Sequence, residues 1–344
     1  MFGIDTRVKE ICGADKDALS QMLVKEQQPV ILRGLVSGWP LVEASRAGPE
    51  SAVTYLKRFY NGKRSMIYQG PSEIRGRYFY NEQVSKLNYE SHMGQIDGML
   101  DSILATLGCD DAPSLYVASN AVDSHFPAMR AENDLTVPIE NPDIPITPPL
   151  ASIWIGNRSL ASCHFDSLEN IACCVAGRRR FVLFPPGQIA NLYPGPLEMT
   201  PGGQAISMVD FYNPDFARYP NFRQALSVGQ VAELKPGDAI YIPTMWWHQV
   251  EGLNDFNILI NYWWSPSAAY LPAGMGALLH AMLGIRDKSA AEKAAWKTLF
   301  DYYVFGDSAT AAKHLPPESQ GILGPMDELK ARRLRSLLLN QLNR

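Results

Sequence analysis

Two short segments of the sequence carry residue types that could form a metal centre. Residues 163–166 have the sequence Cys-His-Phe-Asp, and residues 241–248 form a strand-like run that ends in His248. Side chains two apart in a β-strand point to the same face, so we expect His164 and Asp166 to lie together. Two histidines and one carboxylate can bind one face of a metal and leave the opposite positions open. That arrangement is typical of non-haem Fe(II) oxygenases.

This spacing alone is weak evidence, because a buried histidine bonded to a nearby aspartate is a common structural pair. Zinc is a second interpretation, since Cys163, Cys173 and Cys174 lie near His164. Cys163 would point away from His164, however, and adjacent strand cysteines point apart, which disfavours a shared zinc. The sequence contains no dinucleotide-binding, phosphate-loop, H-E-x-x-H or nucleophile-elbow motif.

Both metal-binding segments lie in a region that predicts many short strands. From about residue 113, apolar runs alternate with Gly, Pro and Asn turns, which indicates an antiparallel sandwich or barrel. The runs are SLYVAS, ASIWIGN, ASCHFD, NIACCVAG, RRFVLFPP, QVAELKPGDAIYIP, WWHQVEGL and NILINYWW. We therefore predict a mainly β core over residues 113–268. Residues 185–226, rich in Pro, Gly and Asn, would form one long excursion from it, and we expect this excursion to line the substrate side.

The flanking regions predict helical additions. In residues 1–112 we expect α/β structure that packs on the core, with helices at 16–27, 51–60 and 98–107, a strand within 29–35 and a break at Trp39-Pro40. Residues 269–344 show helical periodicity, with three apolar stripes. The stripes are Met275, Leu278, Leu279, Met282 and Leu283; Trp296, Leu299, Phe300, Tyr303 and Val304; and Leu334, Leu337, Leu338 and Leu342. They would cover the core or contact a partner.

Composition excludes several classes of protein. The 344 residues carry a formal charge of −4 and are 46% hydrophobic, so neither global disorder nor nucleic-acid binding by bulk charge is expected. No apolar run has the length of a membrane span, and the first residues lack the pattern of a secretory signal. Five cysteines form no disulfide framework. We expect a cytoplasmic protein that binds neither membrane nor nucleic acid.

Several blocks between Trp154 and Ser265 resemble one family, the JmjC/cupin-like Fe(II)- and 2-oxoglutarate-dependent oxygenases, and within it the asparaginyl hydroxylases most. The blocks are HFDSLEN, GRRRFVLFPP, LYPGP, VDFYNPDFARYPNF, PGDAIYIPTMWWHQVE and NILINYWW, with PVILRGLVSGWP near the N-terminus. The resemblance implies a double-stranded β-helix (jelly-roll) core. It also implies Fe(II), 2-oxoglutarate as co-substrate and O2, with release of succinate and CO2.

The resemblance assigns roles to individual residues. It implies iron ligation by His164, Asp166 and His248, contact with the distal carboxylate of 2-oxoglutarate by Tyr116 and Arg179, and asparagines beside the co-substrate and the metal at Asn170 and Asn261. A buried dicarboxylate needs a fixed cation, which an arginine fork supplies. Alternation places Arg179 on the face of Phe181, but parity does not say whether that face is interior. The segment 178–180 could instead be a solvated basic turn.

The substrate side departs from the asparaginyl hydroxylases. Ala205-Ile206 stands where those enzymes carry an Arg-Gln clamp, and Leu168 stands where they carry a glutamine, so the hydrogen bonds to a substrate amide are lost. We expect oxidation of a side chain in a protein or peptide, by hydroxylation or demethylation, with a small-molecule substrate as an alternative. A cupin-type metal enzyme without 2-oxoglutarate and a non-catalytic binding protein remain as other classes. The family further implies a homodimer formed by the C-terminal helices.

Overall fold

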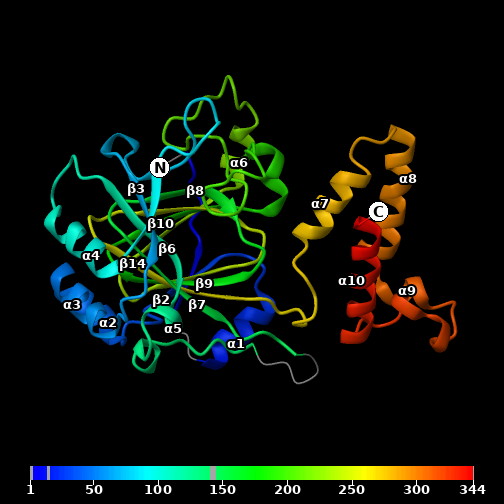
Figure 1. Cartoon of the computed structure of the whole chain (residues 1–344), viewed down its shortest axis with the longest axis horizontal. Helices are drawn as coiled ribbons and strands as arrows, with labels where there is room; N and C mark the ends of the chain where they lie inside the picture. Colours follow the sequence, from blue (N-terminus) through cyan, green and yellow to red (C-terminus); the bar gives the residue numbers. More distant parts are fainter. Residues whose placement is uncertain (1–2, 14–15, 140–144, 344) are drawn as a thin grey trace. The chain divides into compact units, whose positions relative to one another are not determined.

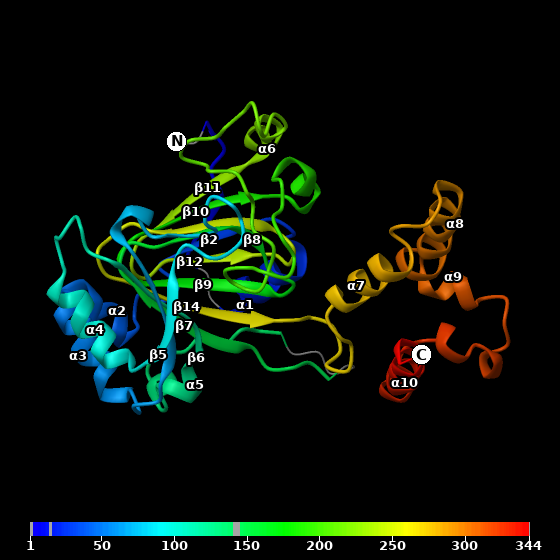
Figure 2. The ribbon, with the colours of Figure 1, turned by 45° about the horizontal axis from the view of Figure 1, so that its top comes forward.

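The computed structural model describes residues 3–13, 16–139 and 145–343. The chain divides into two compact units, one of Met1–Glu140 with Pro148–Pro266 and one of Asn141–Thr147 with Ser267–Arg344. The described residues of the larger unit form fourteen strands, and those of the smaller unit form helices (Figures 1 and 2). The predicted fold class, a mainly β core with helical additions, is confirmed. The division at residues 112 and 268 remains a prediction.

A nine-stranded sheet is the larger of two sheets in the core. Neighbouring strands pair antiparallel, except for the parallel pair β1 and β2. Their order is β1 (Lys9–Cys12), β2 (Val30–Arg33), β12 (Ala239–Ile242), β9 (Glu169–Ala176), β14 (Asn257–Trp264), β7 (Leu150–Gly156), β6 (Ser114–Ala121), β3 (Ser65–Gly70) and β5 (Glu90–Gly94). The N-terminal region thus adds strands to both edges of the sheet.

The second sheet has five strands and carries the two metal-binding segments. Its order is β11 (Gln230–Leu234), β10 (Arg179–Phe184), β13 (Trp247–Gly252), β8 (Leu160–Phe165) and β4 (Arg77–Tyr78). The turn from β9 to β10 uses Gly177, with φ +70°, and a Cβ there would lie 2.3 Å from Asn257 Oδ1. Only glycine fits this turn, which brings Arg179 to the first position of β10.

Two buried apolar clusters lie on opposite faces of the nine-stranded sheet. Strand alternation separates them: Ile171, Cys173 and Val175 join one cluster with the helices, and Ala172 and Cys174 join the other, which lies between the sheets. Cys173 and Cys174 therefore point apart, as their positions in a strand predict.

Helices cover the outer face of this sheet. Figures 1 and 2 both show α2, α3 and α4 side by side. The helical segments of the larger unit are α1 (Lys16–Lys25), α2 (Pro40–Ala47), α3 (Pro49–Phe59), η1 (Ser72–Ile74), α4 (Ile96–Ala105), α5 (Val122–His125), η2 (Met129–Ala131), η3 (Pro186–Asn191) and α6 (Phe222–Val228). The prediction that Trp39-Pro40 only breaks the pattern missed α2. Pro40 begins this helix because the first helical position needs no N–H donor.

The smaller unit is helical, as its periodicity predicts. Its elements are α7 (Met275–Gly284), α8 (Ala290–Phe300), the π-helical η4 (Asp301–Phe305), α9 (Ser308–Ala312), η5 (Pro317–Ser319), η6 (Gly321–Leu323) and α10 (Glu328–Leu342). Many large apolar side chains of these helices are exposed, among them Leu283 at 79% and Leu337 at 53%. None of the helices within the described ranges is long and apolar enough to span a membrane.

Candidate metal centre and co-substrate cavity

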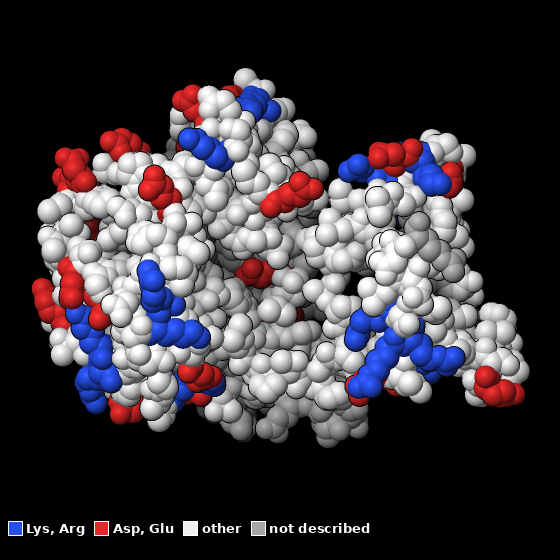
Figure 3. Space-filling model, viewed as in Figure 1, with Lys and Arg blue, Asp and Glu red and all other residues white. Residues whose placement is uncertain are grey.

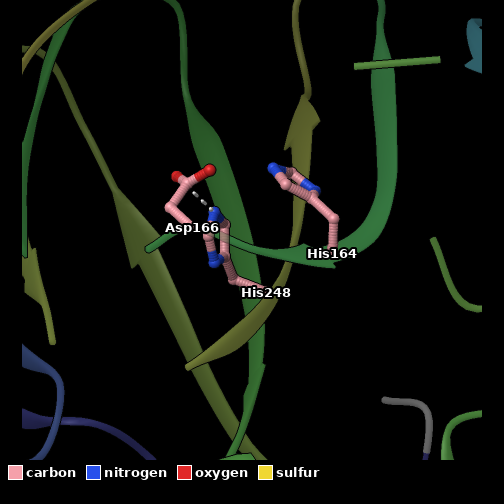
Figure 4. A group of neighbouring side chains, drawn as sticks. All are labelled: His164, Asp166 and His248. Carbon is pink, nitrogen blue, oxygen red and sulfur yellow. Dashed lines mark ion pairs between the residues drawn. The ribbon is translucent and has the colours of Figure 1, made fainter. Parts of the chain in front are cut away.

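The pairing of β8 with β13 brings the three predicted metal ligands together. His164 is opposite His248 in the antiparallel register, and Asp166 follows directly after β8. Their ligand atoms all lie within 4.8 Å of one another, and Figure 4 shows the three side chains converging from the two strands. Phe165, between the two β8 ligands, instead packs on Trp247, with ring centroids 4.9 Å apart. Strand alternation therefore separates the polar face from the apolar one.

Backbone carbonyls fix the tautomer of both histidines. His164 Nδ1 lies 2.8 Å from the Ser162 carbonyl oxygen, and His248 Nδ1 lies 2.9 Å from that of Trp246. A carbonyl only accepts, so each Nδ1 carries a proton, and in the neutral ring the lone pair is then on Nε2. Burial lowers the pKa of His248 to about 4, His164 adds to this shift, and Asp166 opposes it. His248 is therefore neutral at pH 7 and needs to lose no proton to bind a metal.

This donor set suits Fe(II). Two imidazole nitrogens and one carboxylate bind from one side and leave the other positions for further ligands. The carboxylate is close to the second histidine, since Asp166 Oδ2 lies 3.6 Å from His248 Nε2. Within the described residues, no other group of three or more His, Cys, Asp or Glu side chains has the spacing to bind a metal.

A cavity of about 410 Å³ lies beside the three ligands, between the two sheets. All seven residues assigned by the resemblance line it, namely Tyr116, His164, Asp166, Asn170, Arg179, His248 and Asn261. The other lining residues are mostly apolar, and they include Trp154, Phe181 and Trp263. Strands β6, β9, β10 and β14, which are far apart in sequence, each contribute one of the non-ligand residues.

Arg179 is a buried cation in this cavity. It is 2% exposed, and its Nε and Nη2 atoms have no hydrogen-bond partner among the described residues. Its two neighbours differ, because Arg178 pairs with Glu233 at 2.8 Å and Arg180 with Glu251 at 3.1 Å. The solvated-turn interpretation therefore does not apply to Arg179. A buried guanidinium with free N–H groups is costly to the fold and attracts an anion.

The cavity presents further hydrogen-bond donors. Burial raises the pKa of Tyr116 to about 12, and the Arg179 charge acts against that shift, so the phenol is protonated at neutral pH. The indole Nε1 of Trp263 is buried and has no partner in the described part of the chain. These donors and Arg179 match a ligand that carries several oxygen acceptors.

A second cavity, of about 680 Å³, is also lined by His164 and Asp166. Tyrosines dominate its wall, and Tyr78 contacts Tyr89 and Tyr116 with ring centroids 5.0 and 5.5 Å apart. Tyr68 lines it too. Tyr68, Tyr78 and Tyr89 were not among the site residues predicted from the sequence. The aromatic run at 78–80 was a signal, but only the pairing of β3 with β6 and of β4 with β8 places such residues near the metal ligands.

The long excursion after β10 contributes to this second cavity. Pro201, Gly202, Gln204 and Ile206 line it. The excursion is held in place by hydrogen bonds, since Ser207 N donates to the Cys163 carbonyl at 2.7 Å and the Tyr89 hydroxyl donates to the Pro201 carbonyl at 3.2 Å. Ile206 is thus an apolar side chain in the wall of the second cavity.

A family model described as a cupin-like domain matches residues 16–270, which is most of the chain and contains every candidate residue. The chain belongs to this cupin-like family. The resemblance to JmjC/cupin-like proteins is confirmed. The closer likeness to asparaginyl hydroxylases remains a prediction.

Curated relatives of the cupin-like protein are similar over part of their length. It is 32% identical over 153 residues to "Lysine-specific demethylase JMJ31" of Arabidopsis thaliana, covering 41% of this chain and 27% of the relative. It is 26% identical over 258 residues to human "HSPB1-associated protein 1", covering 71% and 49%. For "Lysine-specific demethylase 8" of Xenopus tropicalis the identity is 25% over 246 residues, covering 70% and 48%. The chain thus spans half or less of these relatives.

Proposed function

We propose that this cupin-like protein is an Fe(II)- and 2-oxoglutarate-dependent dioxygenase that hydroxylates or demethylates an amino-acid side chain of a protein or peptide, with release of succinate and CO2. One observation carries the proposal. A buried guanidinium with two unpartnered N–H atoms lines the same cavity as a His-Asp-His cluster. The two parts together fit a metal-bound dicarboxylate, whereas a structural His-Asp pair would need no buried cation beside it.

His164, Asp166 and His248 would hold the iron. Bound Fe(II) supplies the activation of dioxygen and the oxidation of a C–H bond, which no side chain of the protein can perform. The two histidines contribute neutral nitrogens whose orientation the carbonyls of Ser162 and Trp246 fix. The protein's own contribution is therefore a fixed ligand geometry with one side left open.

Arg179 and Tyr116 would hold the distal carboxylate of 2-oxoglutarate. Arg179 offers Nε and Nη2, and protonated Tyr116 offers its hydroxyl. The apolar side chains of Phe181, Val250 and Leu259 line the same cavity and would exclude water from these charged hydrogen bonds. Desolvation strengthens such bonds and would favour one orientation of the co-substrate.

The tyrosine-rich second cavity would receive the substrate side chain. Its wall meets the first cavity at His164 and Asp166. Ile206 and the aromatic rings suit the apolar part of a side chain better than a primary amide, whose hydrogen-bond partners are missing. Two of the relatives bear names of lysine-specific demethylases, which supports an alkylated or aliphatic side chain as substrate.

The exposed apolar side chains of α7, α8 and α10 support a homodimer formed by the C-terminal helices. A monomer would leave the side chains of Leu278, Leu283, Leu337 and Leu342 about half or more exposed to water. Charged side chains of both signs are mixed over the face of the larger unit in Figure 3, which favours no nucleic-acid surface there. A cytoplasmic location is part of the same proposal.

Anaerobic absorption spectroscopy tests the proposed function. Fe(II) followed by 2-oxoglutarate should give a weak visible charge-transfer band, and admission of air should give succinate. The His164→Ala variant should give neither. Metal-dependent turnover of a small molecule without succinate would indicate another cupin-type enzyme. A folded protein that binds no metal and gives no band would indicate a non-catalytic binding protein.

A further inference from the structure

Three polar side chains on neighbouring strands form a directed chain of hydrogen bonds beside the metal ligands. Trp154 lies on β7, Asn261 on β14 and Asn170 on β9. Trp154 Nε1 lies 2.6 Å from Asn261 Oδ1, and Asn261 Nδ2 lies 3.1 Å from Asn170 Oδ1. All three line the co-substrate cavity, and both asparagines are buried.

The strand register explains why these residues meet. Asn261 is opposite Ser152 on β7 and opposite Ala172 on β9. Trp154 and Asn170 are each two residues from those positions, so they point to the same face as diagonal neighbours of Asn261.

The indole N–H fixes the donor-to-acceptor direction of these hydrogen bonds. An amide can present either its oxygen or its nitrogen to a neighbour, but an indole N–H only donates. Trp154 therefore requires Asn261 to turn Oδ1 toward it and Nδ2 toward Asn170. That nitrogen in turn requires Asn170 to accept with Oδ1. Asn170 Nδ2 is left over, and it has no hydrogen-bond partner among the residues that the structure describes.

We propose that Trp154 is a positioning residue for the co-substrate: its indole N–H sets the orientation of Asn261 and Asn170 so that Asn170 presents an N–H donor, not a carbonyl oxygen, to the bound acid. This inference rests on the proposed function, because it assumes that an oxygen-rich anion occupies the cavity. Without the indole N–H, both amides can flip. Asn170 would then turn Oδ1 toward a carboxylate part of the time, which is repulsive.

Amide exchange in the metal-free protein tests the orientation directly. In protein labelled with ¹⁵N-asparagine, the side-chain amide of Asn261, whose Nδ2 donates to Asn170, should exchange slowly, and Trp154→Phe should speed its exchange at least severalfold. Trp263→Phe is the matched control, because Trp263 lines the same cavity but its Nε1 has no partner in the described chain. It should leave the exchange of the Asn261 amide unchanged. Equal effects of the two variants would overturn the inference.

A double-mutant cycle tests the consequence for binding. The dissociation constant of 2-oxoglutarate is measured by calorimetry on the Mn(II)-loaded chain of 344 residues. Trp154→Phe should raise it about fivefold, which corresponds to roughly 1 kcal/mol for one lost hydrogen bond. In a protein that already carries Asn170→Ala, Trp154→Phe should not raise the dissociation constant further, because the donor that Trp154 orients is absent.

The outcomes separate this inference from the proposed function. If Trp154→Phe weakens binding by the same factor in both backgrounds, or has no effect while Asn170→Ala does, Trp154 does not act through Asn170 and the inference is wrong. If wild-type protein binds metal but no 2-oxoglutarate, the proposed function itself fails. Thermal unfolding of each variant shows that it is folded.

Discussion

Replacing Arg179 with methionine should make the protein more stable when no co-substrate is present. Methionine has a similar length but no N–H groups to bury. Arg179 is 2% exposed, and two of its nitrogens have no partner in the described structure. A buried unsatisfied donor costs about 1–3 kcal/mol, so relief of two donors should raise the free energy of unfolding by about 2–6 kcal/mol. At roughly 2 °C per kcal/mol, the unfolding temperature should rise by about 4–12 °C.

The same substitution should remove the response to 2-oxoglutarate. For the wild type, co-substrate at about 100 times its Kd should add about 2.7 kcal/mol to the free energy of unfolding. Two charge-assisted hydrogen bonds, worth about 1.5–3 kcal/mol each, would be missing from the variant, so its Kd should rise by a factor of at least about 100. At the same concentration the variant should show almost no shift in unfolding temperature.

Thermal unfolding of the Mn(II)-loaded proteins, with and without 2-oxoglutarate, measures both effects. Arg178→Met is the matched control. Arg178 is the neighbouring residue, but its side chain is 58% exposed and paired with Glu233. Its loss should change stability by less than about 1 kcal/mol and leave the co-substrate response intact. The reasoning is refuted if Arg179→Met is less stable than the wild type without co-substrate and still responds fully to 2-oxoglutarate.

Three further predictions concern metal binding, Tyr116 and the C-terminal helices. Chelation should remove iron from the wild type reversibly, and His164→Ala should lower the metal content measured by mass spectrometry from about one ion per chain to almost none without unfolding the protein. Tyr116→Phe should weaken 2-oxoglutarate binding about fivefold. Because burial raises the pKa of Tyr116 to about 12, the phenol stays a donor and this factor should be constant from about pH 6 to pH 9 in calorimetry. Light scattering should show a dimer that becomes a monomer on deletion from Asp327 or in Leu337→Glu; an intact protein that is already monomeric would refute the dimer.

Much of the core could be predicted because the strand signals are local. The predicted run NILINYWW forms β14, and RRFVLF forms β10. Alternation placed His164 and Asp166 on one face, and the register of β8 with β13 added His248. The helical periods likewise predicted α7 and α10, since a 3.6-residue pattern needs no knowledge of distant partners.

The rest depends on contacts between segments far apart in sequence. Parity alone could not say whether Arg179 faces the interior, because its neighbours on both faces are apolar. The pairing of β3 with β6 and of β4 with β8 decides where Tyr68 and Tyr78 lie, and no local pattern indicates it. The hydrogen bond from Trp154 to Asn261 also joins two strands about a hundred residues apart. Pro40 shows a different limit, because a proline can begin a helix as well as end one.

Crystallography of the protein with Fe(II) and 2-oxoglutarate, grown without oxygen, tests the central claim most directly. We predict an iron anomalous peak between His164 Nε2, His248 Nε2 and the Asp166 carboxylate, and density for a dicarboxylate against Nε and Nη2 of Arg179. An iron peak at another group, or a cavity beside Arg179 that stays without acid density while the metal is bound, would contradict the account.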